Sequence, residues 1–398
     1  MSRLWDRGEP LHALVLHYSA GEDALLDQEL VPYDLSASAA HAQMLYDSGY
    51  LSVSQREALA QGLTTLAKTH AAGEWAVTLE DEDCHTAIEN RLVALTGDAG
   101  RAIHLGRSRN DQVLAALRLW LKARLDALAS QAGNVAEALE QLATRHEDWP
   151  LPGYTHMQRA MPSTVGLWAR GFAAELRDDA CGLATAKRRA DKNPLGSAAG
   201  YGVPVLSLSR ESTTRQLGFA VTHTPVTAVQ LSRGKAEATA LFEATLMAQD
   251  LGRLAADLCL FNTSEFGFVT LPPAFTTGSS MLPQKRNPDI FELARGRTAE
   301  ACAALQEVLA VTSKLTSGYH RDLQLIKKPL FRGLSAVSGT AAVLCAALPE
   351  LRFDAERMRA AIDPSLLLAE QAYRLVHQEQ IPFREAYQRV RSSQPACG

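Results

Sequence analysis

The sequence predicts an all-α fold, and three observations lead to that prediction. Apolar residues recur at intervals of three and four over several long segments, which is the spacing of one helix face. The alternation that marks strands is almost absent, with short exceptions such as residues 203–208. The uninterrupted helical segments are also longer than the usual helix of about 11–12 residues. Together these features are typical of a protein built from long packed helices.

The first hundred residues predict a small helical domain. Their apolar residues follow helical spacing in three short segments: residues 37–46, 54–67 and 88–95. A polar break at residues 79–85 separates the second segment from the third, and Gly97 ends the third. We therefore assign residues 1–105 to an N-terminal helical domain.

Longer helices are expected from Asp111 onwards. One apolar stripe recurs at helical spacing: Leu114, Leu117, Leu121, Leu125, Leu128, Val135, Leu139 and Leu142. Pro150 and Pro152 end this helix, because proline interrupts helical hydrogen bonding. Three more long helices are expected: residues 163–190, residues 235–261 and a segment from Pro288 to 311. These helices form a central domain over residues 106–350, which leaves a short C-terminal helical domain over residues 351–398.

The helix expected over residues 235–261 is apolar around much of its circumference. Residues 240–260 spread Ala, Leu and Met over several faces, and such a helix needs burial on more than one side. Packing within one chain supplies part of this burial, and association of several chains supplies the rest. We therefore expect a homo-oligomer, although a self-contained bundle gives the same periodicity.

The composition excludes several classes of protein. The 398 residues include 40 Lys and Arg against 44 Asp and Glu, a formal charge of −4, and 46% are hydrophobic. A disordered chain has low hydrophobicity and high net charge, and a nucleic-acid-binding domain has a basic excess. No apolar run approaches the roughly 18 residues that span a bilayer, and the six scattered cysteines form no CxxC pair. We expect a reduced, cytoplasmic protein.

Three segments between the long helices contain residues that are typical of a functional site and not of a simple connecting loop. The first, residues 106–112, reads GRSRNDQ and offers two guanidinium groups at a helix start, where free N–H groups attract anions. Helix capping by Asn110 or Asp111 explains one residue but not both arginines. The second, residues 152–162, holds His156 between hydroxyl and amide groups, either as an acid–base residue or as an ordinary solvated histidine.

The third segment, residues 276–289, reads TTGSSMLPQKRNPD and is the strongest candidate. Glycine and two serines predict a mobile loop rich in hydroxyl groups, and Lys285 and Asn287 follow as donors to an oxyanion. Pro288 then begins a helix on which Glu292 projects one turn in. A flexible surface loop commonly has this Gly and Ser content, but it does not explain Lys and Asn placed two residues apart before a helix.

The sequence carries no signature of a metal or nucleotide cofactor. It has no HExxH, no GxxxxGK[ST] and no four-ligand Cys/His set. Gly200 and Gly202 lack the preceding strand that a dinucleotide-binding loop requires. We therefore expect no cofactor, and the expected partners are a small-molecule substrate and further copies of the chain, with no nucleic acid and no membrane.

In this order between long helices, the three segments resemble the fumarase/aspartase superfamily and, in detail, its argininosuccinate lyase family. The matching motifs are GRSRNDQ (106–112), PGYTHMQRA (152–160), GSSMLPQKRNPD (278–289), DEDCHTAIENRL (81–92), PLGSAAGYG (194–202) and GYHRDLQLIK (318–327). The resemblance covers most of residues 1–390. It implies a three-domain all-α fold whose central long-helix bundle assembles into a homotetramer with shared active sites. It also implies a carbon–nitrogen lyase that splits argininosuccinate reversibly into arginine and fumarate, the last step of arginine biosynthesis.

The family's pattern implies roles for individual residues. Ser279 is the expected catalytic base, and its anionic form needs strong local stabilisation because a serine hydroxyl is very weakly acidic. Lys285 and Asn287 are expected to hold the carboxylate that gains charge. His156, paired with Glu292, is expected to help protonate the leaving guanidino nitrogen. Nine further residues are expected to bind the substrate, the first near its arginine end and the rest at its carboxylates: Asp27, Ser108, Arg109, Asn110, Thr155, Ser280, Tyr319, Gln324 and Lys327.

The chain departs from the family's common motifs at Leu105, at Met161, in the order Met281-Leu282 and at Arg286. These departures indicate a divergent bacterial-type branch. Two alternatives remain open: a sister lyase that releases fumarate from another substrate, such as adenylosuccinate, aspartate or malate, and a non-catalytic, crystallin-like structural protein on the same fold. Loss of Ser279, His156 or Lys285 would favour the structural role, and all three are present.

Overall fold

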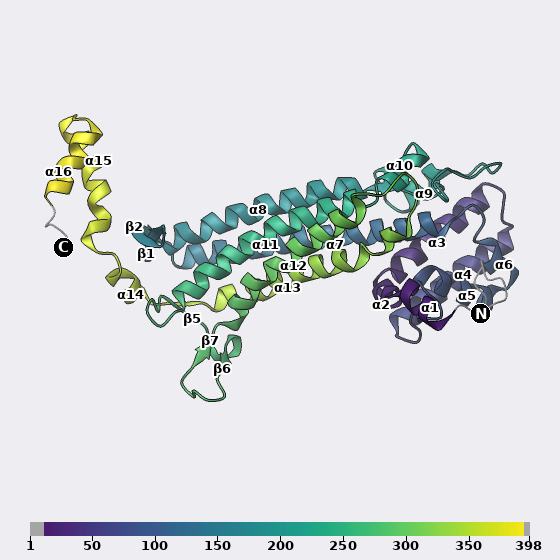
Figure 1. The fold of residues 1–398 in the computed structure, drawn as a ribbon, viewed down its shortest axis with the longest axis horizontal. Coiled ribbons are helices and arrows are strands. Elements are labelled where there is room, and N and C mark those ends of the chain that lie inside the picture. Colours follow the sequence, from purple (N-terminus) through teal and green to yellow (C-terminus); the bar gives the residue numbers. More distant parts are fainter. Residues whose placement is uncertain (1–11, 394–398) are drawn as a thin grey trace. The chain divides into compact units, whose positions relative to one another are not determined.

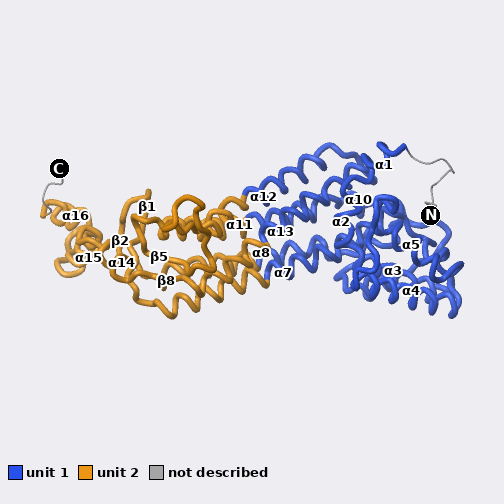
Figure 2. The backbone as a smooth tube through the Cα atoms, turned by 90° about the horizontal axis from the view of Figure 1, so that it is seen from below, with its two compact units in different colours: residues 1–129, 181–245, 299–337 blue, residues 130–180, 246–298, 338–398 orange. Residues whose placement is uncertain are grey.

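The computed structural model describes residues 12–393 and confirms that the chain is predominantly helical (Figure 1). The chain forms two compact units (Figure 2). Unit 1 comprises the described parts of residues 1–129, 181–245 and 299–337, and unit 2 those of residues 130–180, 246–298 and 338–398. Each unit contains part of every long helix among the described residues: α7 (Arg109–Arg145), α8 (Val165–Ala190), α11 (Lys235–Phe261), α12 (Asp289–Thr312) and α13 (Lys327–Ala347). The division into three successive domains stays a prediction.

Helices make up most of the N-terminal region: α1 (Ala13–Ala20), α2 (Asp23–Leu26), η1 (Asp27–Glu29), α3 (Val31–Asp47), α4 (Val53–Ala71), α5 (Cys84–Thr96) and α6 (Asp98–Ala102). The three segments predicted here are confirmed as parts of α3, α4 and α5. α4 begins with a capping box, in which the Ser52 hydroxyl accepts from the Gln55 N–H and the Gln55 side chain accepts from the Ser52 N–H. Gly97 ends α5 with a φ of 60°, a conformation that glycine adopts without strain.

The apolar stripe predicted on the first long helix is confirmed. Its eight residues, from Leu114 to Leu142, are each at most 2% exposed on α7. Full burial of such side chains contributes roughly 1.5–3 kcal/mol each, so this face is a major source of core stability. The helices expected over residues 163–190 and 235–261 match α8 and α11, and the helix expected from Pro288 is α12.

The apolar character of α13 corrects one expectation. Residues 321–350, which contain α13, form the one segment within residues 12–393 that is long and apolar enough to cross a membrane by length and composition. In the structure, 56% of its most apolar window is buried within the protein. Burial of this kind is typical of a core helix, and the sequence analysis was wrong that no apolar run approaches this length.

Four two-stranded sheets interrupt the helices of residues 12–393: β1 (Pro150–Thr155) with β2 (Gln158–Thr164), β3 (Lys192–Asn193) with β4 (Val221–Thr222), β5 (Val269–Thr270) with β8 (Arg352–Phe353), and β6 (Thr277–Gly278) with β7 (Arg286–Asn287). The β3–β4 pair is parallel and the others are antiparallel. The second of the segments between the long helices, residues 152–162 around His156, is therefore part of the β1–β2 hairpin. Its prolines and glycine show no strand alternation, which is why the sequence did not reveal it.

The remaining elements are short: α9 (Arg210–Gln216), α10 (Val226–Leu231), η2 (Pro273–Phe275), η3 (Arg321–Gln324), η4 (Leu348–Glu350), α14 (Ala355–Ala360), η5 (Pro364–Leu367), α15 (Leu368–Glu379) and α16 (Phe383–Ser392). α15 and α16 pack around a small core of Ala372, Ala386 and Val390. The five cysteines among the described residues are free, and Cys397 lies outside those residues.

Candidate active site

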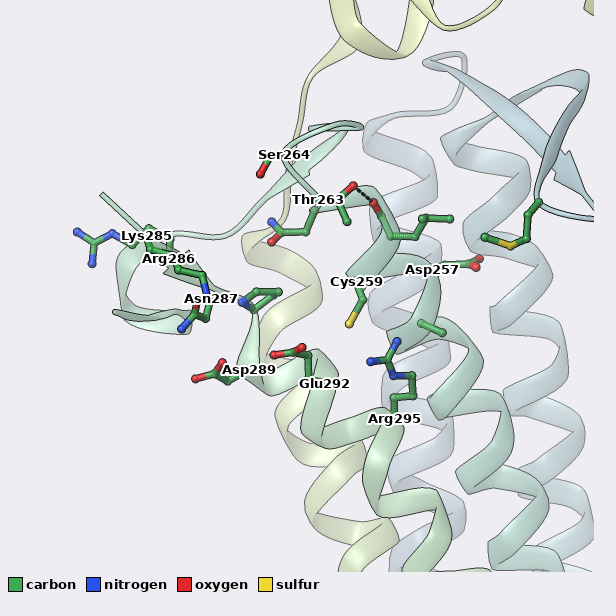
Figure 3. Close-up of a pocket in the computed structure, with 15 residues that line it drawn as sticks. Asp257, Cys259, Thr263, Ser264, Lys285, Arg286, Asn287, Asp289, Glu292 and Arg295 are labelled. Carbon is green, nitrogen blue, oxygen red and sulfur yellow. Dashed lines mark hydrogen bonds between the residues drawn. The ribbon is translucent and has the colours of Figure 1, made fainter. Parts of the chain in front are cut away.

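A pocket of about 690 Å³ lies in unit 2, where the end of α11 meets the start of α12 (Figure 3). Lys285 and Asn287 line it from the segment before α12, and Glu292 and Arg295 line it from the first turns of that helix. Met157, next to His156, contributes from the β1–β2 turn. The pocket therefore brings together two of the three segments that the sequence singled out.

The Ser279 loop is held at its base by the β6–β7 hairpin, in which Thr277 lies opposite Asn287. The Asn287 side-chain amide donates to the Thr277 hydroxyl at 3.5 Å, and that hydroxyl donates to Asp289 in the first turn of α12. A carboxylate is favoured there because the N-terminal end of a helix carries partial positive charge. These contacts tie both ends of the loop, residues 279–285, to the helix that carries Glu292.

Ser279 has surroundings suited to an anionic oxygen. Its Oγ accepts hydrogen bonds from the backbone N–H of Met281 at 3.2 Å and from that of Leu282 at 3.1 Å. Donors aimed at an oxygen favour its charged form, in the manner of an oxyanion hole. Lys285 closes the same turn, since its N–H donates to the Leu282 carbonyl at 3.0 Å. The loop thus supplies part of the stabilisation that a serine base requires.

His156 lies at the tip of the β1–β2 hairpin. Thr155 pairs with Gln158, so His156 and Met157 form a two-residue turn. Both have positive φ, 52° and 61°, a conformation that such turns usually give to Asn or Gly. Non-glycine residues held there cost about 1–3 kcal/mol each, and such strain clusters at functional sites. This favours a functional role for His156 over an ordinary solvated histidine.

A second group of charged side chains lies in unit 1, at the start of α13. Lys327 Nζ lies 2.9 Å from Asp23 Oδ2 and 2.7 Å from Asp27 Oδ1, and all three side chains are at most 7% exposed. Burial raises the pKa of Asp23 to about 6, although the Lys327 ammonium opposes this shift. Burial also acts to lower the pKa of Lys327, but the two carboxylates outweigh it and raise that pKa above its ordinary value. Lys327 is therefore a buried, charged cation.

Arg109, the first residue of α7, lies beside two buried acids. Its Nε lies 2.5 Å from Asp83 Oδ2, and its Nη1 lies 3.5 Å from Glu82 Oε2. The Arg109 side chain is 35% exposed while both acids are at most 3% exposed, so the guanidinium remains accessible to a ligand. A narrow cavity of about 20 Å³ lies between these groups and is also lined by Tyr319 and Gln324.

Ser108 and Asn110 flank Arg109 and are held by local hydrogen bonds. The Ser108 hydroxyl accepts from the Asn110 N–H at 3.3 Å. The Asp111 carboxylate accepts from the N–H groups of Ser108, Gly196 and Ala198 at 2.9–3.0 Å. Burial raises the pKa of Asp111 to about 6, against the effect of these hydrogen bonds. Asp111 therefore ties the first motif to the glycine-rich motif before α9.

The chain is similar to known lyases over almost its whole length. Residues 17–302 match the family model described as Lyase. The chain is 47% identical over 388 residues to argininosuccinate lyase of Sorangium cellulosum (strain So ce56), covering 98% of this chain and 90% of that protein. It is 43% identical over 396 residues to argininosuccinate lyase of Stenotrophomonas maltophilia (strain R551-3), covering 99% and 91%. The chain belongs to the argininosuccinate lyase family.

The fold of this argininosuccinate lyase family member is also that of more distant enzymes. The class II fumarase of Schistosoma mansoni superposes with a TM-score of 0.79 at 16% identity, covering 94% of this chain and 91% of that chain. At this identity the likeness concerns the fold alone. It agrees with the fumarase/aspartase-like, all-α architecture expected from the motifs.

The site residues expected from the argininosuccinate lyase family fall into two groups. Unit 2 holds seven of them: Thr155, His156, Ser279, Ser280, Lys285, Asn287 and Glu292. Unit 1 holds the other seven: Asp27, Ser108, Arg109, Asn110, Tyr319, Gln324 and Lys327. The hydrogen bonds and ion pairs of the described residues include none between His156 and Glu292, so their pairing stays a prediction.

The sequence analysis missed several charged residues at both sites. Asp23, Asp83 and Arg233 line the cavity of unit 1, and Arg295 lines the pocket of unit 2. Asp83 belongs to the DEDCHTAIENRL motif, which was a usable signal. Asp23 precedes Asp27 by four residues, about one helical turn, which was a weaker signal. Arg233 and Arg295 lie outside the quoted motifs, and their positions depend on packing between distant segments.

One buried group in unit 1 has residue types that bind metals. Asp27, Cys84 and His85 offer ligand atoms within 4.8 Å of one another. However, Asp27 already accepts a hydrogen bond from Lys327, and His85 Nδ1 lies 2.9 Å from Asp34 Oδ2. Burial raises the pKa of the Cys84 thiol well above its ordinary value, which disfavours the thiolate that a metal requires. The Asp27–Lys327 and His85–Asp34 ion pairs therefore account for the close approach of these residues.

Proposed function

We infer that this chain is a carbon–nitrogen lyase that splits argininosuccinate reversibly into arginine and fumarate, the last step of arginine biosynthesis. Near-full-length similarity to argininosuccinate lyases supports the reaction. The observation on this chain that carries the mechanism is the Ser279 oxygen with its two backbone donors. β-Elimination begins with removal of a weakly acidic proton beside a carboxylate, so the base must be strong and the resulting anion must be stabilised.

Ser279 acts as the base in this proposal. Its anionic Oγ takes the proton from carbon, and the charge passes to the neighbouring carboxylate, which becomes a doubly negative aci-carboxylate held by Lys285 and Asn287. The C–N bond then breaks, its electron pair leaves with the guanidino nitrogen, and the double bond of fumarate forms. His156, as an imidazolium favoured by the Glu292 carboxylate, helps that nitrogen gain its proton, directly or through water.

The unit 1 cluster binds the rest of the substrate in this proposal. Arg109 and Lys327 supply positive charge for carboxylates, and Asp27 lies near the arginine end. The remaining anchoring residues are Ser108, Asn110, Thr155, Ser280, Tyr319 and Gln324. Charge-assisted hydrogen bonds to carboxylates are about twice as strong as neutral ones, so the two cations contribute most.

Complete sites form in a homotetramer, each from residues of several copies, according to this proposal. One observation supports association: the long helices expose large apolar side chains. The exposed residues, at 38–66%, are Leu167, Phe242, Leu246, Leu293 and Leu309. Exposed apolar surface of this kind marks interaction sites. Light scattering after size-exclusion chromatography tests the assembly, and a fully active monomer would contradict shared sites. We propose a cytoplasmic location, in keeping with the free cysteines.

The activity is tested by following fumarate through its ultraviolet absorbance. The purified protein is given argininosuccinate, adenylosuccinate, aspartate or malate in separate assays. Release from argininosuccinate supports the proposal, release only from another substrate assigns a sister lyase, and no release from any of them leaves a structural role.

Ser279→Ala tests the base directly. We expect it to abolish turnover while the oligomer and its thermal stability stay unchanged, because Ser279 lies in a surface loop and, among the described residues, its hydroxyl is hydrogen-bonded to that loop's own N–H groups. Ser313→Ala, at an exposed serine just after α12, is the matched control and should retain full activity. Substantial residual turnover in Ser279→Ala would remove Ser279 as the base.

A further inference from the structure

Arg233 is a buried cation whose donors the protein leaves largely unused. It lies between α10 and α11, and its side chain is 2% exposed. Nη2 donates to the Leu323 carbonyl at 3.3 Å, and Nε lies 3.8 Å from Glu237 Oε1, beyond hydrogen-bond distance. Among the described residues, Nε and Nη1 have no hydrogen-bond partner. Buried charged donors without partners are costly, so a ligand from outside the chain is the natural partner.

Arg233 lines the same narrow cavity as the cluster around Lys327. The other two cations of that cavity are already paired, Lys327 with Asp23 and Asp27, and Arg109 with Asp83. Within the described part of the chain, Arg233 is the one cation of this cavity with no carboxylate oxygen at hydrogen-bond distance. Its ion pair with Glu237, at 3.8 Å, is the longest of those made by the three cations, so Arg233 can accept an anion with the smallest loss of internal pairing.

The acids of the cavity restrict which anion fits. Asp23, Asp27 and Asp83 all line it, and they repel a ligand that carries two carboxylates close together. An amino-acid head group carries one ammonium and one carboxylate on the same carbon. Its ammonium can face the acids of the cavity while its carboxylate faces Arg233. The cavity is narrow, at about 20 Å³, so only the end of a ligand reaches Arg233.

We propose that Arg233 binds the α-carboxylate at the amino-acid end of the substrate, with the α-ammonium group facing Asp23 and Asp27. This inference rests on the proposed function, because it takes arginine and argininosuccinate as the ligands. It adds a specificity role: the enzyme recognises a free α-carboxylate far from the bond that breaks. A purely structural role for Arg233, holding Glu237 and the Leu323 carbonyl, is the competing explanation.

Inhibition of argininosuccinate cleavage by arginine and by agmatine, the amine that remains when arginine loses its α-carboxylate, separates the two explanations. In the wild type, we expect arginine to bind at least tenfold more tightly than agmatine. Arg233→Gln should raise the inhibition constant of arginine and the KM of argininosuccinate by about 10- to 100-fold, the range for one charge-assisted hydrogen bond. The constant for agmatine should stay unchanged, and Arg233→Lys should recover part of the loss.

Arg118→Lys is the matched control, because Arg118 is a buried arginine of the same unit that does not line the cavity. Its Nη1 donates to the Lys192 carbonyl at 2.5 Å and lies 3.0 Å from His223 Nδ1. We expect this control to lower the unfolding temperature without changing the ratio of the two inhibition constants. Arg233 variants that weaken arginine and agmatine equally, or neither, would overturn the proposal in favour of the structural role.

Calorimetric titration of arginine into the wild type and into Arg233→Gln measures binding directly, so it tests the role of Arg233 independently of the proposed lyase activity. A wild type that releases no fumarate from argininosuccinate overturns the proposed function. Arginine binding that weakens in Arg233→Gln would still support the α-carboxylate site, and equal binding by both proteins would overturn it. Arg233→Lys provides the same comparison where the glutamine variant fails to fold.

Discussion

Replacing Lys327 with Met leaves two buried carboxylates without the cation that now lies within 2.9 Å of both. The side chains of Asp23 and Asp27 are 7% and 0% exposed, so water cannot replace the lost ammonium. Removing one partner of a buried ion pair costs about 3–5 kcal/mol, because the remaining charge stays uncompensated. We therefore expect Lys327→Met to lower the free energy of unfolding of unit 1 by about 3–5 kcal/mol at pH 8.

The pH dependence of this loss follows from Asp23. Burial raises its pKa from 3.8 to about 6 even though the Lys327 ammonium lowers it, so removing the ammonium raises the pKa further. A carboxyl whose pKa is higher in the folded state stabilises the fold below its unfolded pKa and loses that contribution as the pH rises through the folded pKa. The deficit of Lys327→Met should therefore be largest near pH 8 and smaller at pH 5.

Lys328 offers a matched control one residue away. It contacts Glu22, but both side chains are more than half exposed, and exposed ion pairs contribute little to stability. Urea unfolding followed by tryptophan fluorescence and by circular dichroism measures both variants. We expect a much smaller loss for Lys328→Met, without a pH trend. Equal losses for the two variants, or a Lys327→Met deficit that does not change with pH, would refute the reasoning.

Two further predictions concern unit 2. His156→Asn should lower kcat strongly and remove one limb of the pH–rate profile, because asparagine cannot titrate; a profile that keeps both limbs would show that another group donates the proton. Phe291→Ala should lower the free energy of unfolding by about 3–5 kcal/mol, because its fully buried ring lies directly before Glu292. Leu293→Ala, 60% exposed in the single chain, should change unfolding less and weaken assembly, as calorimetry and light scattering would show.

Helices were predictable from the sequence where burial imposes a period. The stripe from Leu114 to Leu142 had to recur at helical spacing because all of it is buried on one face. The β1–β2 hairpin was not predictable in the same way, because its pairing depends on backbone hydrogen bonds in a segment rich in proline. The strained turn at His156 and Met157 was equally hidden, since neither residue type indicates positive φ.

The site was predictable as a set of motifs but not as a set of contacts. The resemblance to the family indicated both Asp27 and Lys327, yet these residues are 300 positions apart, and only the folded chain shows that they share a buried ion pair. Asp23 and Arg233 gain their importance in the same way, from the cavity that distant segments enclose. Sequence motifs identify the residues that the expected reaction requires. The residues that neutralise or orient them can be found only from tertiary packing.

The two groups of site residues differ in their exposure to water, and this difference bears on how catalysis is achieved. Lys327 and Arg109 of unit 1 are paired with buried acids before any ligand arrives, so that site is suited to recognition. Lys285, by contrast, is exposed in its loop, and an ammonium in contact with water stabilises a doubly negative carboxylate only weakly. In the proposed mechanism, the loop must therefore be covered before Ser279 and Lys285 work at full strength. Cover from a further copy of the chain meets this need, so activity should be lost on dissociation before either unit unfolds.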